Sequence, residues 1–139
     1  SRVFVLTSSR TCSASESIIN GLSPFVQVVL IGQDTCGKPY GFIQKNNCKT
    51  AYFAIQFAGV NAKGQGDYAN GFKPQCYTND DLEHALGTTS ETRLAAALSY
   101  ARTGKCPATA FSPAPGQSSE VSEKELRSPV WRQIKLHNR

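Results

Sequence analysis

Two short apolar runs near the start of the chain predict buried β-strands. Residues 2–7 (RVFVLT) and 26–31 (VQVVLI) are rich in β-branched residues and short enough for strands that are buried on both faces. Between them, Ile18, Ile19 and Leu22 would share one face of a helix. Strand, helix and strand at this spacing predict a right-handed crossover in a largely parallel sheet, and hence an α/β fold.

Loops of small and polar residues separate the later apolar runs. Residues 32–41 hold three glycines and a proline, so we expect a loop at the end of the second strand. Residues 51–58 (AYFAIQFA) alternate well enough for a third strand. A glycine-rich loop at 59–71 and a short extended segment at 72–77 are expected to follow.

Two helices are expected next. Asn79 can cap a helix over 81–86 (DLEHAL), and Ser90 can cap a second helix over 91–103 (ETRLAAALSYART). The apolar residues of the second helix recur at helical spacing, and Gly104 would end it. The sequence therefore predicts a helical pair after the strands.

A change of composition after Cys106 suggests where the folded part ends. Residues 107–119 contain three prolines and three serines without any charge, which is typical of a linker, and the polar end of the chain carries the single Trp131. We therefore expect a folded unit at 1–106, followed by a Pro/Ser-rich linker and a polar tail at 107–139.

Composition argues against several classes of protein. The chain of 139 residues is 40% apolar and 18% charged, which is typical of a globular domain. No apolar run approaches the ~20 residues that span a bilayer, and the first residues lack the features of a signal peptide. The net charge of +5 comes from scattered basic residues, so nucleic acid is not expected as a partner. The chain has no Met and opens inside an expected strand, as a mature form or a fragment would.

Five cysteines in so short a chain suggest an oxidising compartment and two disulfides, with five free thiols in a reducing compartment as the alternative. Their spacing matches neither a zinc knuckle nor a Cys-x-x-Cys motif, so no metal or cofactor is expected. Cys36 and Cys48 flank one loop, and Cys76 and Cys106 flank the expected helices. We predict the bridges Cys36–Cys48 and Cys76–Cys106, with Cys12 free because a bridge there would constrain the neighbouring turn.

The turn at 11–16 (TCSASE) has two interpretations. Ser13 and Glu16 fit the capping box Ser-x-x-Glu, a common feature of helix N-termini. The same turn places the Ser13 hydroxyl between a strand and a helix, where free amides and the helix dipole favour developing negative charge. If Ser13 attacked a carbonyl group, the N–H of Ala14 could donate to the oxyanion.

A nucleophilic serine needs a base. His84 and His137 have no acidic partner motif beside them in the sequence, so a Ser–His–Asp triad finds little support. Lys38 lies in the loop after the second strand, and adjacent parallel strands end at the same edge of a sheet, so Ser13 and Lys38 should lie within side-chain reach. A desolvated, neutral Lys38 could then act as the base, whereas an ordinary surface lysine is the alternative.

These two segments together resemble the tail-specific, or carboxy-terminal processing, serine peptidases. That family carries Thr-x-Ser-Ala-Ser-Glu and then Gly-(Glu/Gln)-x-Thr-x-Gly-Lys; the chain has TCSASE and GQDTCGK, with Lys38 25 residues after Ser13. The resemblance is clear over residues 3–80 and looser as far as Gly104. It implies an endopeptidase for unfolded or tail-exposed proteins, with a ClpP/crotonase-like β/α spiral core. It also implies Ser13 as nucleophile, Lys38 as general base and the Ala14 N–H as oxyanion donor.

The chain departs from the family pattern in three ways. Phe42 stands where many members have a Gln that orients the lysine, so Gln44 is the candidate for that role. The family's catalytic domain begins well upstream of its nucleophile and supplies a second oxyanion donor from there. We therefore expect an inactive fragment, whose partners would be the missing half of the domain and a polypeptide substrate. The cysteines indicate an exported branch, periplasmic or lipid-anchored at the cell envelope of a bacterium.

Two other functions are compatible with such a fold. A non-catalytic ligand-binding module would use Ser13 as a cap and leave Lys38 solvated, but it has no reason to keep both residues at this separation. An acyl-CoA-handling crotonase relative would need glycine-rich oxyanion loops that the sequence does not show. The serine peptidase is therefore favoured. If the upstream strands are missing, the sheet would have an exposed edge, and we expect self-association through it.

Overall fold

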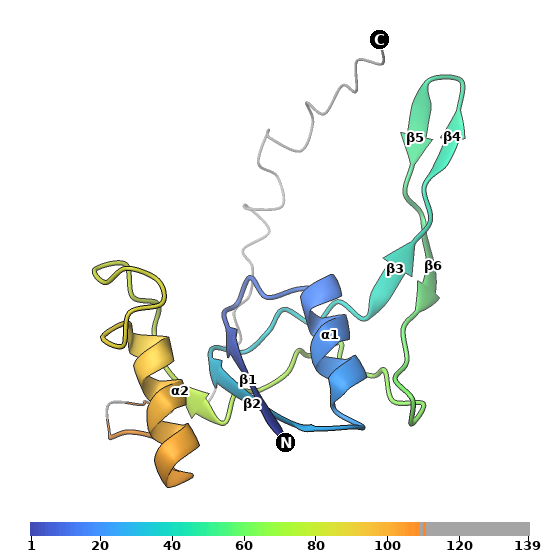
Figure 1. Cartoon of the computed structure of the whole chain (residues 1–139). Helices are drawn as coiled ribbons and strands as arrows, with labels where there is room; N and C mark the ends of the chain where they lie inside the picture. Colours follow the sequence, from blue (N-terminus) through green and yellow to red (C-terminus); the bar gives the residue numbers. More distant parts are fainter. Residues whose placement is uncertain (109, 111–139) are drawn as a thin grey trace.

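A three-stranded parallel sheet forms the centre of the fold (Figure 1). The computed structural model describes residues 1–108 and 110. Its central strands are β1 (Arg2–Thr7), β2 (Gln27–Gly32) and β7 (Cys76–Tyr77), in the order β1-β2-β7. The helix α1 (Ala14–Leu22) connects β1 to β2, so the predicted strand–helix–strand unit with parallel strands is confirmed. Apart from residues 107, 108 and 110, the linker and tail expected at 107–139 lie outside the described residues.

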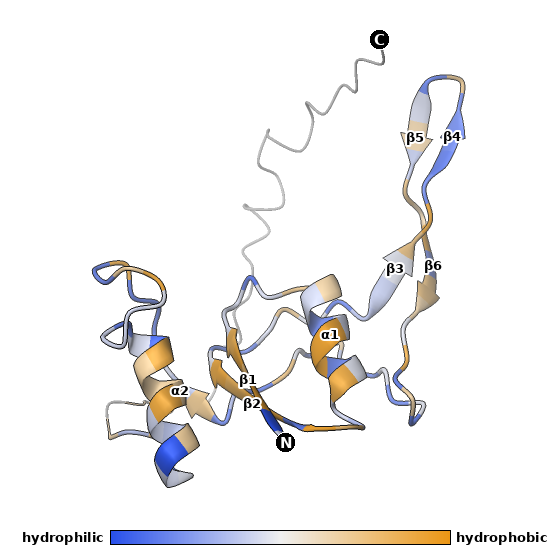
Figure 2. Ribbon diagram, in the orientation of Figure 1, coloured by the Kyte–Doolittle hydropathy of each residue, from blue (hydrophilic) through white to orange (hydrophobic). Residues whose placement is uncertain are grey.

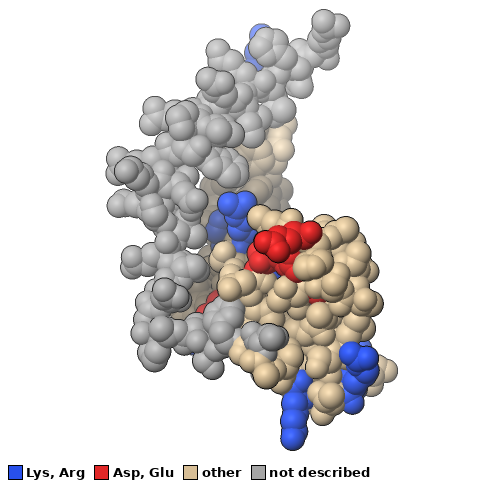
Figure 3. All heavy atoms as spheres, turned by 90° about the vertical axis from the view of Figure 1, so that its left-hand side faces the viewer, with Lys and Arg blue, Asp and Glu red and all other residues tan. Residues whose placement is uncertain are grey.

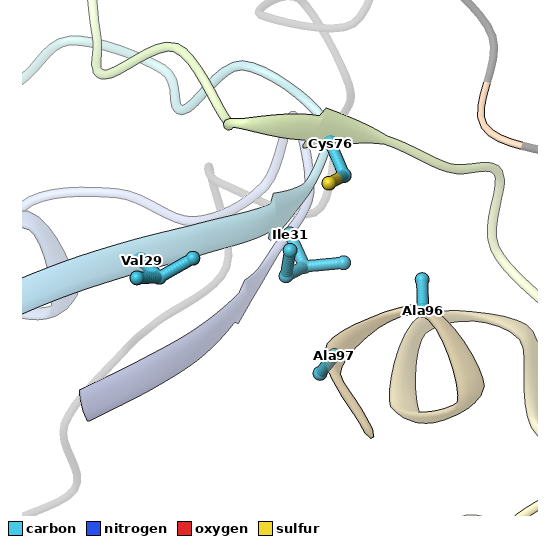
Figure 4. Packing of buried hydrophobic residues seen from close by; sticks show 5 residues of the cluster. All are labelled: Val29, Ile31, Cys76, Ala96 and Ala97. Atoms are coloured by element: carbon cyan, nitrogen blue, oxygen red, sulfur yellow. The ribbon is translucent and has the colours of Figure 1, made fainter. Parts of the chain in front are cut away.

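The hydrophobic core lies between β2 and the helix α2 (Thr92–Thr103), and Figure 4 shows its buried cluster: Val29, Ile31, Cys76, Ala96 and Ala97. Val29 and Ile31 are alternate residues of β2, so they share one face of the sheet. Leu30 lies between them, points to the opposite face and is also buried, and α1 contacts β2 as well. The strand β2 is therefore buried on both faces, as its continuous apolar run predicts.

Only one of the two helices expected after the strands forms in the described part of the chain. The structure has bends and turns within 82–91 instead of the helix predicted at 81–86. Leu82 and Leu86 are 92% and 90% exposed, so a helix of six residues would gain no packing to offset the cost of its nucleation. The predicted helical pair is therefore wrong.

The start of α2 also differs from the prediction. Its N-cap is Glu91 rather than Ser90, and the buried Glu91 carboxylate accepts hydrogen bonds from the N–H groups of Arg93 and Leu94 at 3.1 and 2.7 Å. Gly104 ends the helix in the left-handed conformation, with φ of 69°, as predicted. A long acidic side chain does here what a shorter cap residue ordinarily does.

Residues 40–58 form a ribbon that projects from the sheet (Figure 1). The ribbon comprises two antiparallel pairs, β3 (Tyr40–Phe42) with β6 (Ile55–Ala58) and β4 (Lys45–Asn47) with β5 (Thr50–Tyr52). The single strand predicted at 51–58 is thus divided between β5 and β6, and neither joins the central sheet. Figure 2 shows β1 and β2 as mostly apolar, whereas the helices and the ribbon mix apolar and polar residues.

Two positive φ angles at the tip of the ribbon explain why the sequence does not predict this hairpin. Its tip is a two-residue turn at Cys48 and Lys49, whose φ angles are 46° and 71°. Hairpin turns of this kind need positive φ at both central residues, and their usual sequence signal is Asn-Gly or Asp-Gly. Cysteine and lysine give no such signal.

The glycine-rich loop at 59–71 packs against α1. Asn20, on α1, donates from Nδ2 to the carbonyl of Gln65 at 2.8 Å. Tyr68 is buried and stacks on Phe72, with ring centroids 4.8 Å apart. These contacts hold the loop at 59–71 against α1 and Phe72.

Candidate active site

Ser13 occupies a turn between β1 and α1 in an unusual backbone conformation. Its φ and ψ are 53° and −110°, and Ser13 is the N-cap of α1. An N-cap residue ordinarily has extended angles, so a capping role does not require this conformation. A serine with positive φ on a sharp strand-to-helix turn is the arrangement of a nucleophile elbow, and such strain costs about 1–3 kcal/mol. The side chain of Ser13 is exposed.

The amide of Ala14 lies at the N-terminus of α1, and its role as an oxyanion donor stays a prediction. Ala14 is the first residue of α1, and the N–H groups of the first helical turn have no partner within the helix. Because the helix dipole places partial positive charge at this end, negative charge beside Ser13 would be stabilised.

The loop after β2 carries Lys38 to the same edge of the sheet. Gly37, directly before it, has a φ of 78° and leaves no space for a side chain, because an added Cβ would lie 2.1 Å from the carbonyl oxygen of Ala69. The backbone of this loop is therefore pressed against the glycine-rich loop at 59–71. Lys38 itself is exposed.

A buried carboxylate joins the two loops. Glu16, on α1, is fully buried, and its Oε2 accepts hydrogen bonds from the N–H of Ser13 at 2.9 Å and the N–H of Lys38 at 2.8 Å. The two backbone nitrogens are thus no further apart than the sum of these distances, 5.7 Å. The structure therefore brings the backbones of Ser13 and Lys38 together, while contact between their side chains stays a prediction.

The second oxygen of Glu16 holds the rest of the lysine loop. Oε1 accepts from the N–H of Gly37 at 2.7 Å and from the hydroxyl of Thr35. The hydroxyl oxygen of Thr35 in turn accepts from the N–H of Phe72 at 2.7 Å. The sequence indicates only the local half of this role, the capping contact to Ser13, because the partners on the lysine loop are 19 to 22 residues away.

A disulfide also joins the two loops, and it is not the bridge that the sequence predicts. Cys36 pairs with Cys12, so the predicted Cys36–Cys48 bridge is wrong and Cys12 is not free. Cys48 lies exposed as a free thiol at the tip of the ribbon, and the ribbon carries it away from the lysine loop (Figure 1). The bridge constrains the turn of Ser13, because Cys12 directly precedes it.

The other predicted bridge, Cys76–Cys106, is present in the structure. Its Cα atoms lie 5.5 Å apart, and it ties the residues after α2 to β7. Cys76 belongs to the buried core cluster between β2 and α2 (Figure 4). This bridge therefore braces the core rather than the site.

The side chain of Gln44 is engaged on the ribbon. Its Nε2 donates to Oδ1 of Asn46 at 2.7 Å, and both residues are exposed. Its orienting role for Lys38 stays a prediction.

A cavity of about 580 Å³ lies at the base of the ribbon, between residues 39–40, 58–60 and 64–67. Pro39, which directly follows Lys38, is one of its lining residues.

His84 does have an acidic partner, which the sequence did not indicate. Its Nδ1 lies 2.9 Å from Oδ2 of Asp81, and the same oxygen accepts from the N–H and hydroxyl of Thr92. The hydrogen bond from Thr92 contributes most to holding the pKa of Asp81 well below its usual value. This pair organises the start of α2. Acidic and basic side chains form separate small groups on the face that bears α2 (Figure 3).

Burial raises the pKa of Tyr77 to about 12, and a 2.7 Å hydrogen bond from its hydroxyl to Asp34 acts in the same direction.

The described residues contain no group of three His, Cys, Asp or Glu side chains that could hold a metal ion. Among these residues, no helix is long and apolar enough to cross a membrane.

A solved structure is similar to this chain in fold and in sequence. The "Putative S41 protease" from Bacteroides fragilis matches 74% of the chain at 35% sequence identity, with a TM-score of 0.67. The chain covers 28% of the length of that protein. No protein-family model matches the sequence, and no curated protein matches it. The likeness in fold and sequence supports a peptidase fold for this chain.

Proposed function

We propose that this chain carries the nucleophile and the base of a serine endopeptidase. The observation that carries the proposal is the strained backbone of Ser13, whose N–H shares one buried carboxylate oxygen with the N–H of Lys38. A helix cap does not need positive φ, and a surface lysine does not need its loop tied to a serine turn. A catalytic pair on these two loops would account for both.

In the proposed reaction, the neutral amine of Lys38 takes the proton from the Ser13 hydroxyl as its oxygen attacks a peptide carbonyl. The N–H of Ala14 stabilises the resulting oxyanion, and the Lys38 ammonium returns the proton to the departing amine. Water then releases the acyl group by the same steps. As the family resemblance implies, the substrates are unfolded or tail-exposed polypeptides. The same resemblance implies that the enzyme has a ClpP/crotonase-like core.

The family resemblance implies that a further part of the catalytic domain supplies a second oxyanion donor to the proposed site. The chain spans 28% of its structural neighbour, and losing one oxyanion donor alone typically lowers turnover ~100–1000-fold. We therefore expect the isolated chain to be inactive. Among the described residues β1 forms an edge of the sheet, where the remaining part of the domain or a second copy would pair. The two disulfides are compatible with an exported protein of the bacterial periplasm or cell envelope.

The test assays cleavage of an unfolded protein by this chain and by the full gene product that contains it. Ser13→Ala in the full product should remove turnover by at least ~1000-fold, whereas Ser15→Ala, an exposed serine two residues further on, should keep it. If turnover survives Ser13→Ala, the binding module becomes the better explanation of the fold.

The role of Lys38 is tested separately. Lys38→Arg keeps the positive charge but cannot give a neutral amine, so it should be as inactive as Lys38→Ala. Turnover should also rise with pH, because only the neutral amine accepts the proton. An active Lys38→Arg variant would show that Lys38 serves as a cation and not as the base.

A further inference from the structure

The Cys12–Cys36 bridge lies at the junction of the two loops that form the candidate site. Cys12 directly precedes Ser13, and Cys36 stands two residues before Lys38. Their Cα atoms are 5.3 Å apart, and the N–H of Cys36 donates to the carbonyl of Thr11 at 3.0 Å. The bridge therefore covalently joins the serine turn to the lysine loop.

The strained turn depends on restraints from both sides. On its C-terminal side, Glu16 accepts from the Ser13 N–H. On its N-terminal side, the bridge fixes Cys12. A non-glycine residue keeps positive φ only while its surroundings over-determine it, so opening the bridge removes one of these restraints.

We propose that the Cys12–Cys36 disulfide is a redox switch that holds the site in its active geometry. The inference rests on the proposed peptidase function. In the reduced state the serine turn and the lysine loop are joined by hydrogen bonds alone, and Ser13 relaxes away from its strained conformation. An endopeptidase for unfolded chains would then stay inactive in a reducing compartment and become active after export.

The chemistry of the switch is thiol–disulfide exchange. On activation, two S–H bonds break and one S–S bond forms, while two electrons and two protons pass to a disulfide oxidant, which becomes a dithiol. On inactivation, a dithiol reductant attacks through a mixed disulfide and the transfer is reversed. Cys12 and Cys36 are both partly exposed, so a small dithiol can reach them.

The experiment uses the full gene product with Cys48→Ser, so that no free thiol of this chain can exchange with the bridge. Peptidase activity on a cysteine-free unfolded substrate is measured after equilibration with graded ratios of oxidised to reduced dithiothreitol. We expect activity to fall about 10–100-fold on reduction and to return on oxidation, because small misplacements of reacting groups cost this much. Backbone amide exchange at Ser13, Gly37 and Lys38 should become faster in the same transition.

Two double variants separate this switch from a general loss of stability. Cys12→Ser/Cys36→Ser should have the low activity of the reduced protein and should not respond to the dithiol. Cys76→Ser/Cys106→Ser, which removes the bridge of the core, should lose stability but keep the response. Circular dichroism establishes that each protein is folded.

The outcomes distinguish the switch from the peptidase itself. Full activity with the Cys12–Cys36 bridge open, or a peptide map that pairs these cysteines differently, overturns the switch and leaves the proposed function standing. If the oxidised protein cleaves no substrate, or does so independently of Ser13, the proposed function fails. In that case amide exchange still tests whether the bridge holds the serine turn and the lysine loop. Unchanged exchange on reduction overturns this coupling, whereas faster exchange supports it.

Discussion

Two carboxylates each gather backbone N–H groups, and they organise two very different regions. Glu16 is fully buried and collects donors from the serine turn and the lysine loop, which are far apart in the sequence. Asp81 accepts from Glu83, His84 and Thr92, all within eleven residues. The first arrangement joins distant loops into one site. The second shapes a single loop, whose Leu82 and Leu86 remain exposed.

The two carboxylates differ in how much of the structure depends on each: two distant loops depend on Glu16, and a single loop depends on Asp81. Replacing Glu16 removes the acceptor of donors on two loops at once, and its carboxylate is fully buried, where water does not readily take its place. The donors around Asp81 lie near the surface and can be hydrated. The same chemistry should therefore have large and distant effects in one region and small, local effects in the other.

The largest expected effect follows from Glu16→Gln. The amide NH₂ of Gln must face one pair of donors, so two charge-assisted hydrogen bonds are lost and stability should fall by about 3–6 kcal/mol. Turnover of the full gene product should fall as well, because the serine turn and lysine loop are no longer held together. Urea unfolding of this chain measures the first effect. Asp81→Asn is the matched control and should cost far less; equal losses in both variants would remove the distinction between the two regions.

A second comparison uses two glycines that differ in their surroundings but not in their backbone. Gly37 and Gly87 have φ of 78° and 85°, but an added Cβ at Gly87 meets nothing within 4 Å, whereas at Gly37 it collides with Ala69. Gly87→Ala should therefore cost only the strain of a positive φ, about 1 kcal/mol. Gly37→Ala must also move the backbone of the lysine loop and should cost about 2–4 kcal/mol. Similar midpoints of urea unfolding for the two variants would show that the loops at 33–39 and 59–71 are not tightly packed.

The strand–helix–strand unit could be predicted because its signals are local. The apolar runs of β1 and β2 and the spacing of Ile18, Ile19 and Leu22 each arise within a few residues. The motifs around Ser13 and Lys38 could be found in the same way. The role of Glu16 on the lysine loop could not, because it depends on where the backbone brings Gly37 and Lys38.

The errors have the same physical origin. The sequence predicts the Cys36–Cys48 bridge because these residues flank one loop, but the ribbon carries Cys48 away and the parallel pairing of β1 with β2 brings Cys12 near. The helix predicted at 81–86 has suitable residues and a suitable cap, yet Leu82 and Leu86 are exposed and gain no packing. In both cases tertiary structure decided between options that local sequence left open.

Acid should affect the region around Asp81 modestly and with a defined sign. Because the folded pKa of this carboxyl is lowered, its contribution to stability is present above the ordinary value near 3.8 and is lost as pH falls below it. Amide exchange at Thr92 should therefore become faster below about pH 4, relative to the intrinsic rate. In Asp81→Asn this extra acid dependence should be absent; if it persists, another carboxyl group holds the start of α2.

The smallest effect is expected where the loop at 79–91 exposes its apolar residues. Leu86 is 90% exposed, so Leu86→Ala removes no buried surface and should change stability by less than about 0.5 kcal/mol. Leu30 is 4% exposed on β2, and the same substitution there should cost about 2–5 kcal/mol. Urea unfolding of the two variants gives the comparison directly. A loss above about 1 kcal/mol for Leu86→Ala would mean that the loop packs in solution, and Asp81 would then hold a folded unit comparable to the one that Glu16 holds.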